Sequence, residues 1–227
     1  LVLTYAIALA ASVFAMARWY KVGVHFYVLF QFQLMGLAGA FLTGDLFNLF
    51  VFFEIMLAAS YGLLLHGSGR ARVQAGLHFI AINLAASSLF LVGVSLLYGL
   101  TGTLNMAEIG VRVAQAAPED VALIQAAAGI LLTVFCAKAA LLPMFLWLPM
   151  TYKFLPAPAA VLFVVMTKVG VYSALRVFTL AFGDIPGADG WPWSWLLPAA
   201  LITLLLATFL SLYTSPSPRD LSTSRMP

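Results

Sequence analysis

Long apolar runs with few polar residues are the feature that most limits how this chain can fold. The run at residues 44–67, for example, reads GDLFNLFVFFEIMLAASYGLLLHG. A helix needs about 20 such residues to cross a hydrocarbon core of about 30 Å. Because lipid offers no water to backbone amides, only helices and closed barrels can span it, and these runs lack the alternation of barrel strands. The sequence therefore predicts an all-α, polytopic transmembrane helical bundle.

The composition excludes a water-soluble globule and gives no sign of an enzyme. Of the 227 residues, 63% are hydrophobic and 8% are charged, against about 45–50% and about 25% in a soluble domain. The net charge of +3 is too small to indicate nucleic-acid binding. The sequence has a single cysteine, Cys136, and contains no Cys/His cluster, no HExxH and no nucleophile elbow. We therefore expect no metal, no cofactor and no covalent catalysis.

Seven spans are predicted, with one discontinuous helix among them: residues 1–18, 24–43, 45–66, 76–100, 122–150, 156–182 and 194–213. The fifth is too long for a straight crossing and contains Pro143, which removes an intrahelical hydrogen bond. We expect the helix to break there, with its freed carbonyls facing protein or a water-lined cavity. In the loop 101–121, a short surface helix is predicted to start near Asn105.

The predicted domain organisation is one transmembrane domain over residues 1–213, followed by a tail over residues 214–227. The tail, TSPSPRDLSTSRMP, changes abruptly from apolar to Ser/Pro/Arg, and we expect it to be disordered. Leu1 already lies inside a hydrophobic segment. We therefore expect the chain to be a piece of a longer protein.

Loop charges alternate in sign along the chain, which predicts its orientation. Basic residues follow the first, third and fifth spans: Arg18 and Lys21, Arg70 and Arg72, and Lys153. Acidic residues dominate the other loops: Asp45, Glu108, Glu119, Asp120, Asp184 and Asp189. Because positive loops stay cytoplasmic, Leu1 is expected on the outer side and the three basic loops on the cytoplasmic side.

Glu54, Lys138 and Lys168 are charges placed near the middle of three different predicted spans. A charge at that depth costs about 2.5–3.5 kcal/mol on insertion scales, so such groups usually face the bundle interior and pair. One interpretation is a static pair of Glu54 with Lys138 that fixes helix packing. Since a static pair leaves Lys168 unexplained, we favour stations for a mobile proton or cation.

Weaker candidates lie at the starts of the third and fourth spans. Asp45 and Asn48 stand one turn apart, and Asp45 is interpreted either as a helix N-cap or, with Asn48 and His78, as part of an ion path. Asn83 and the Ser87-Ser88 pair could line a hydrated path, but small polar residues also serve helix–helix contact, which we favour.

Four segments resemble one family of membrane proteins: GDLFNLFVFFEIMLAASYGLL (44–64), LLYGLTGTLNMAEIG (96–110), KAALLPMFLWLP (138–149) and PAPAAVLFVVMTKVGVYSALRVF (156–178). They are similar to the antiporter-like subunits, a family that includes the D subunits of Mrp-type Na⁺/H⁺ antiporters. Complex I and membrane-bound hydrogenases contain related subunits. The resemblance covers nearly all of residues 1–213.

The resemblance implies a partial antiporter-like fold, with one five-helix repeat complete and the second barely begun. It implies that Glu54, Lys138 and Lys168 form a proton relay at mid-membrane. It also implies a hetero-oligomeric complex in the bacterial inner membrane, moving H⁺ and Na⁺ or K⁺. Three alternatives stay open: a proton-pumping subunit of complex I or a hydrogenase, a non-transporting scaffold, and a small-solute carrier. The missing second repeat leaves it open whether this chain alone transports anything.

Overall fold

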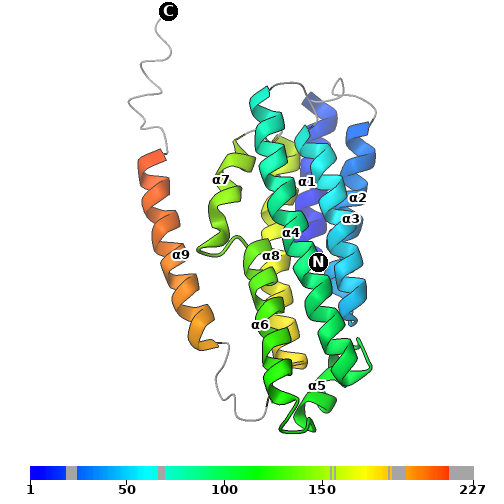
Figure 1. Cartoon of the computed structure of the whole chain (residues 1–227). Coiled ribbons are helices and arrows are strands. Elements are labelled where there is room, and N and C mark those ends of the chain that lie inside the picture. The colour runs from blue at the N-terminus through cyan, green and yellow to red at the C-terminus, as the bar shows by residue number, and fades with distance from the viewer. Residues whose placement is uncertain are drawn as a thin grey trace, which may run out of the picture. The chain divides into compact units, whose positions relative to one another are not determined.

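The structure, a computed structural model, describes residues 1–18, 25–65, 70–153, 155, 157–183, 185 and 193–214. These residues contain helices and no strand (Figure 1). The helices are α1 (Val2–Arg18), α2 (His25–Leu42), α3 (Leu46–Leu65), α4 (Arg70–Thr101), α5 (Met106–Ala114), α6 (Val121–Lys138), the 3₁₀ helix η1 (Met144–Leu146), α7 (Trp147–Tyr152), α8 (Ala157–Leu180) and α9 (Trp193–Thr214). Residues 1–189 form one compact unit, and α9 belongs to a second unit.

The prediction of an all-α membrane protein is confirmed. Five helices of the described chain, α2, α3, α4, α6 and α8, are each long and apolar enough to cross a membrane. The first and last predicted spans correspond to α1 and α9, whose described apolar stretches are shorter, at 2–17 and 196–209. The predicted surface helix is α5, and its N-cap is Asn105 as expected.

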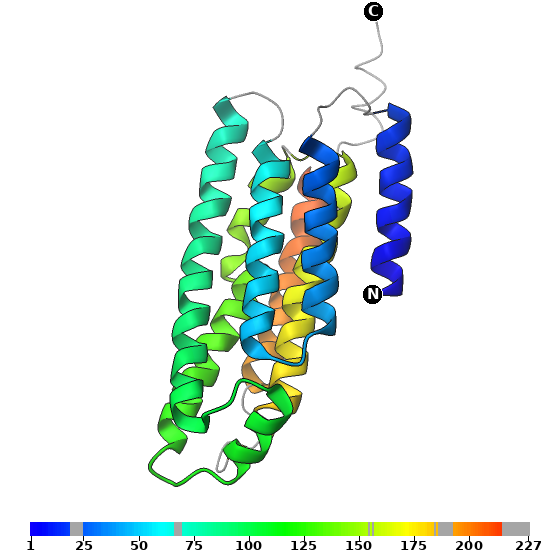
Figure 2. The ribbon, with the colours of Figure 1, turned by 90° about the vertical axis from the view of Figure 1, so that its right-hand side faces the viewer.

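In the first unit, neighbouring helices of the chain pack side by side. Figure 2 shows α2, α3 and α4 as an antiparallel row. α6 packs against α4, and α8 packs against α6, α2 and α1. The backbones of α2 and α3 come very close at Gly36, where an added Cβ would lie 2.8 Å from the backbone nitrogen of Met56. This packing places α4 between α3 and α6. Polar side chains of these three helices can therefore meet.

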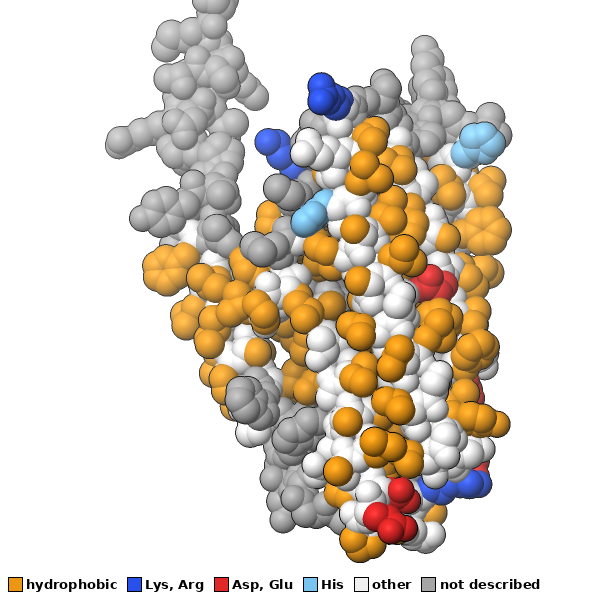
Figure 3. Space-filling model, viewed as in Figure 1, with side chains coloured by type: hydrophobic (Ala, Val, Ile, Leu, Met, Phe, Trp, Pro, Cys, Tyr) orange, Lys and Arg blue, Asp and Glu red, His pale blue; other side chains and the backbone are white. Residues whose placement is uncertain are grey.

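Charged loop residues gather at the two ends of this unit. Figure 3 shows Lys and Arg side chains at the end where α4 begins, and most of the visible acidic side chains at the end that carries α5, where Arg112 pairs with Glu108. Arg70 and Lys153 are exposed, as are Glu108 and Glu119. The charge separation thus follows the predicted alternation. Lys21, Asp184 and the side chain of Arg18 lie outside the described residues, and the assignment of the basic end to the cytoplasm stays a prediction.

Candidate functional site

Glu54 and Lys138 approach each other through the hydroxyl group of a third residue, Ser87. Ser87 Oγ, on α4, donates a hydrogen bond to Glu54 Oε1 on α3. Lys138 Nζ, on α6, donates to the same Ser87 Oγ over 3.4 Å. Lys138 is 4% exposed, whereas Glu54 is half-buried. The acid and the amine predicted from the sequence are therefore brought together, but in the described chain a hydroxyl bridge replaces a direct ion pair.

Aromatic rings enclose the amine end of this cluster. Lys138 Nζ lies 4.7 Å from the centroid of the Phe53 ring, within cation–π range. The Phe53 ring contacts Phe90, and Phe90 contacts Phe135, with centroids 6.2 and 5.6 Å apart. All three rings are fully buried. The Lys138 ammonium is thus held between a hydroxyl group and an apolar wall.

Ser87 is used differently from other hydroxyl residues on these helices. Ser60 donates to the carbonyl of Leu57, and Ser88 donates to that of Leu84, within their own helices. Ser87 donates instead to a side chain on another helix. The sequence favoured simple helix contact for this serine. The usable signal was its position four residues after Asn83, which puts both polar groups on one buried face of α4.

Lys138 is the last residue of α6, and the chain turns sharply just after it. Leu141 N donates to Cys136 O at 2.9 Å, and Ala140 N donates to Ala137 O at 3.2 Å, which is the hydrogen-bond pattern of a Schellman motif. Ala140 has φ of +55°, the left-handed conformation that this motif requires. Pro143 lies inside the interruption, as predicted, but the helix itself ends five residues earlier because of this turn.

One carbonyl at the break is bonded by a buried side chain. Trp147 Nε1 donates to the carbonyl oxygen of Ala137 at 3.0 Å, and Trp147 is 1% exposed. From α8, Gly170 lies against the break so closely that an added Cβ would be 2.6 Å from Ala139 N. These contacts fix the end of α6, and therefore the base of the Lys138 side chain.

Lys168 is not part of this cluster. Its side chain is exposed on α8, and it makes no hydrogen bond or ion pair with other described residues. Its helix still passes the break, because Gly170, two residues further on, touches Ala139. The structure thus joins two of the three predicted relay residues and leaves the third on the outer face of a neighbouring helix.

Asp45 is the N-cap of α3. Its Oδ1 accepts a hydrogen bond from Asn48 N at 2.9 Å, which matches one of the two interpretations of Asp45. Its backbone forms an antiparallel bridge with Asn105, the N-cap of α5. Leu46 N donates to Leu104 O, so the two capping turns are paired. A role for Asp45 in an ion path stays a prediction.

His78 and Asn48 are both exposed. His78 precedes Ser87 on α4, and Asn48 precedes Glu54 on α3. His78 lines a hollow of about 340 Å³ between α4, α6 and the break. The hollow also contacts Ala86 and Ala137, which are the sequence neighbours of Ser87 and Lys138, as well as Pro143. The hollow therefore lies at the break, and none of the three cluster side chains lines it. The ion-path hypothesis for His78 and Asn48 also stays a prediction.

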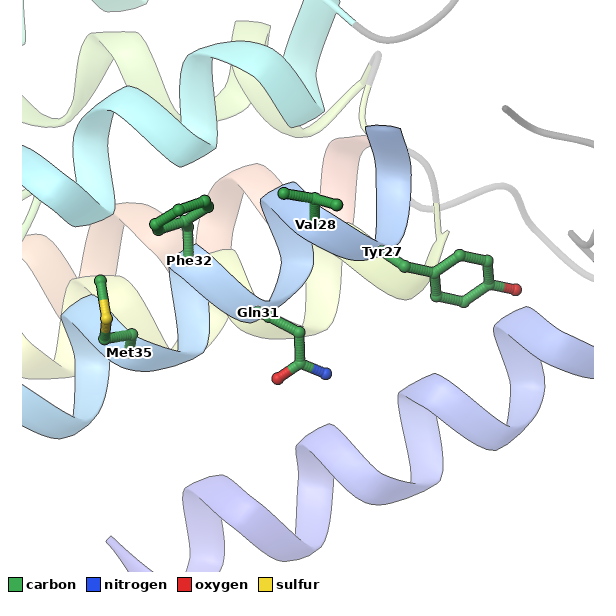
Figure 4. A pocket seen from close by; sticks show the side chains of 5 residues that line it. All are labelled: Tyr27, Val28, Gln31, Phe32 and Met35. Carbon is green, nitrogen blue, oxygen red and sulfur yellow. The ribbon is translucent and has the colours of Figure 1, made fainter. Parts of the chain in front are cut away.

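A second hollow, of about 400 Å³, lies over the outer face of α2. Its lining residues are Tyr27, Val28, Gln31, Phe32 and Met35. Figure 4 shows Tyr27 and Gln31 pointing to one side of the helix, away from Val28 and Phe32. No acidic or basic side chain lines it. Among the described residues, no group of three His, Cys, Asp or Glu could hold a metal ion.

Comparisons with known proteins agree with the resemblance read from the sequence. The family model described as "NADH:quinone oxidoreductase/Mrp antiporter, TM" matches residues 43–224. The D subunit of a probable K⁺/H⁺ antiporter of Rhizobium meliloti is 53% identical over 205 residues, 90% of this chain and 38% of the relative. The D subunit of the Na⁺/H⁺ antiporter of Alkalihalophilus pseudofirmus is 48% identical over 164 residues, 72% of this chain and 33% of the relative.

A solved structure gives the same result for the fold. A chain in the structure of the Mrp complex from Dietzia superposes with a TM-score of 0.70 and 32% identity, over 79% of this chain and 34% of that chain. This chain therefore spans between one third and two fifths of the length of these relatives. The family match continues past residue 213, and the predicted division into a domain and a tail at that point stays a prediction.

Proposed function

This chain belongs to the NADH:quinone oxidoreductase/Mrp antiporter transmembrane family, and we propose that it is part of a subunit that moves protons in exchange for a cation. The observation that carries the proposal is the meeting of Glu54 and Lys138 across Ser87, from three separate helices. Each helix is long and apolar enough to span a membrane. The subunit is a transporter component and not itself an enzyme.

The proposed mechanism is electrostatic. A direct unit-charge pair 4 Å apart is worth about 4 kcal/mol at an effective dielectric of 20. Glu54 and Lys138 are held apart by a hydroxyl group, so their attraction is weaker than this. A membrane potential contributes about 2.3 kcal/mol per charge per 100 mV. A single transfer crosses only a fraction of that potential, so we propose that a nearby charge and the field together move the proton on Lys138.

Lys168 is the proposed next station for that proton. It lies on α8, the helix whose Gly170 touches the backbone beside Lys138, but its side chain is on the other face of that helix, so the proton would have to pass around α8 to reach it. Proton transfer between the two lysines would pass the break between α6 and η1, where Ala140 and Pro143 interrupt the helix. Water near the hollow that adjoins Pro143 would complete the connection.

The proposed setting is a hetero-oligomeric complex in a bacterial inner membrane, with the basic loops on the cytoplasmic side. Glu54 is half-buried and Lys168 is exposed in this chain. A charge in lipid costs about 2.5–3.5 kcal/mol at the helix centre. We therefore expect protein, not lipid, to pack against Glu54 and Lys168. Other subunits, or further helices of the longer protein, would supply that cover.

The cation is proposed to be Na⁺ or K⁺, because relatives named for each are similar to this chain. The alternative is a proton-pumping subunit of NADH:quinone oxidoreductase, which the family description also names. Both relatives are named antiporter subunits, and this favours antiport. Antiport measured in vesicles without a redox substrate separates the two, since a redox-driven pump needs electron transfer.

The decisive experiment is the substitution Lys138→Ala in the full-length protein within its complex. Everted vesicles energised with a proton gradient are supplied with Na⁺ or K⁺, and proton release is followed with a pH-sensitive dye. Antiport should be lost in the Lys138→Ala variant and kept in a Lys153→Ala control, whose lysine is exposed at the end of α7. Undiminished antiport by the Lys138→Ala variant would refute the relay.

A further inference from the structure

We infer that the hydroxyl group of Ser87 carries the proton between Lys138 and Glu54. The inference rests on the proposed function and adds to it a residue on α4. The observation behind it is that one oxygen, Ser87 Oγ, is bonded to both charged side chains. No direct bond joins Glu54 with Lys138 in the described chain, so the hydroxyl is the connection that the structure offers.

The chemistry of a hydroxyl group suits this position. A serine Oγ has one proton to donate and two lone pairs to accept with. Here it donates to the Glu54 carboxylate and accepts from the Lys138 ammonium, which uses both capacities at once. A carboxylate can only accept and an ammonium can only donate. These directions are the ones that an ionised Glu54 and a protonated Lys138 require.

The transfer conserves every atom and moves no electrons between oxidation states. An N–H bond of Lys138 breaks as an O–H bond forms on Ser87, and the original O–H bond of Ser87 breaks as one forms on Glu54. Lys138 is left as a neutral amine and Glu54 as a neutral acid, while Ser87 remains a hydroxyl group. The reverse exchange restores the charges. No co-reactant is needed.

The burial of the cluster makes this route specific. Ser87 is 4% exposed, and the buried ring of Phe53, itself packed on Phe90, stands beside Lys138. A serine in a helix often donates its hydrogen bond to a backbone carbonyl of the same helix, as Ser88 does to Leu84. Ser87 is held away from that bond by the carboxylate on α3.

The test compares Ser87→Thr with Ser87→Val in the full-length protein within its assembled complex. The two side chains have the same shape, but only threonine keeps a hydroxyl group, and valine leaves no room for a water in its place. Antiport in everted vesicles should stay within about threefold of the unaltered rate for Thr. It should fall about a hundredfold for Val, the lower end of the effects of a proton-transfer group. Ser88→Ala is the matched control and should be unaffected.

Equal rates for the Thr and Val variants would overturn the inference, since a contact role depends on shape and not on the hydroxyl group. Should the added methyl group prevent assembly in both, Ser87→Cys is compared with Ser87→Ala, and equal rates would again overturn it. Lys138→Ala is measured in parallel. If the Lys138→Ala variant is inactive while the Ser87→Val variant is normal, the role of the Ser87 hydroxyl is refuted and the proposed function stands. If the Lys138→Ala variant is active, the proposed function itself is refuted.

Discussion

The two carboxylates of α3 show two different uses of an acid in a membrane protein. Asp45 opens the helix and accepts from the backbone of Asn48, and its own backbone is paired with the turn at Asn105. Glu54, nine residues further on, accepts from a side chain of another helix, which in turn accepts from Lys138. The first acid is committed to the backbone. The second has partners that can gain or lose a proton while the helices stay in place.

The comparison explains why burial alone does not identify a relay. At Asp45 the bonded groups are backbone amides, whose protons are fixed, so the cap stabilises the helix whatever the membrane potential is. At Glu54 the bonded group is the Ser87 hydroxyl, which is itself bonded to the Lys138 amine, and both of these groups can exchange protons. The chemical nature of the partner therefore separates the N-cap Asp45 from Glu54, the acid proposed for the relay.

The largest predicted effect breaks this comparison directly. Glu54→Gln removes the charge but keeps the shape, which leaves the buried ammonium of Lys138 without its acid. We expect antiport to fall about a hundredfold, since general acid–base groups contribute at least that much. Asp45→Asn should keep nearly the full rate, because asparagine caps helices as well as aspartate does. Vesicle antiport at equal amounts of complex measures both, and comparable losses would show that the two acids are not different in kind.

The second prediction concerns the support behind Lys138. Gly170→Ala would place a methyl group 2.6 Å from Ala139 N, against backbone that cannot move aside easily. We expect a loss of about 1–3 kcal/mol, the usual cost of overpacking, seen as a lower unfolding temperature of the detergent-solubilised complex. In Gly99→Ala the new methyl group meets no atom within 4 Å, so this control should unfold at or above the original temperature. Equal shifts would contradict the close contact.

Much of this arrangement was predictable because charges in apolar runs are expensive. Glu54 and Lys138 stood out in the sequence for that reason, and the structure joins them. Ser87 did not stand out as a partner of either charge, because the sequence does not show whether a helical serine bonds to its own backbone or to another helix. The end of α6 at Lys138 was also missed: the proline pointed to residue 143, whereas an alanine in the left-handed conformation ends the helix.

That alanine gives the third prediction. The left-handed conformation costs a non-glycine residue about 1–2 kcal/mol, and glycine is the usual residue at this position of a Schellman motif. Ala140→Gly should therefore stabilise the complex by up to about 1 kcal/mol, after the greater chain entropy of glycine is subtracted. Ala139→Gly, at a position with φ of −79°, should instead destabilise it. Thermal unfolding of the two variants measures the difference, and a lower unfolding temperature for Ala140→Gly would contradict the cost assigned to this turn.

The smallest predicted effect concerns Glu108, an acid on the short helix α5, outside the membrane spans. Hydrogen bonds from Thr103 and then Arg112 hold the pKa of Glu108 below its ordinary value of 4.5. A lowered pKa favours the folded loop above the ordinary value, and this contribution is lost as the pH falls through the lower folded value. Amide hydrogen exchange in α5 should therefore quicken slightly at acid pH, beyond its intrinsic pH dependence.

The effect should be slight because Glu108 and Arg112 are exposed to solvent, where ion pairs contribute little. Glu108→Gln keeps an acceptor for Thr103 but has no proton to gain, so its exchange should follow the intrinsic pH dependence alone. If the glutamine variant shows the same acid response as the unaltered chain, another group is responsible. Antiport should be the same in both, since Glu108 lies on the short helix α5 and takes no part in the Glu54–Ser87–Lys138 cluster.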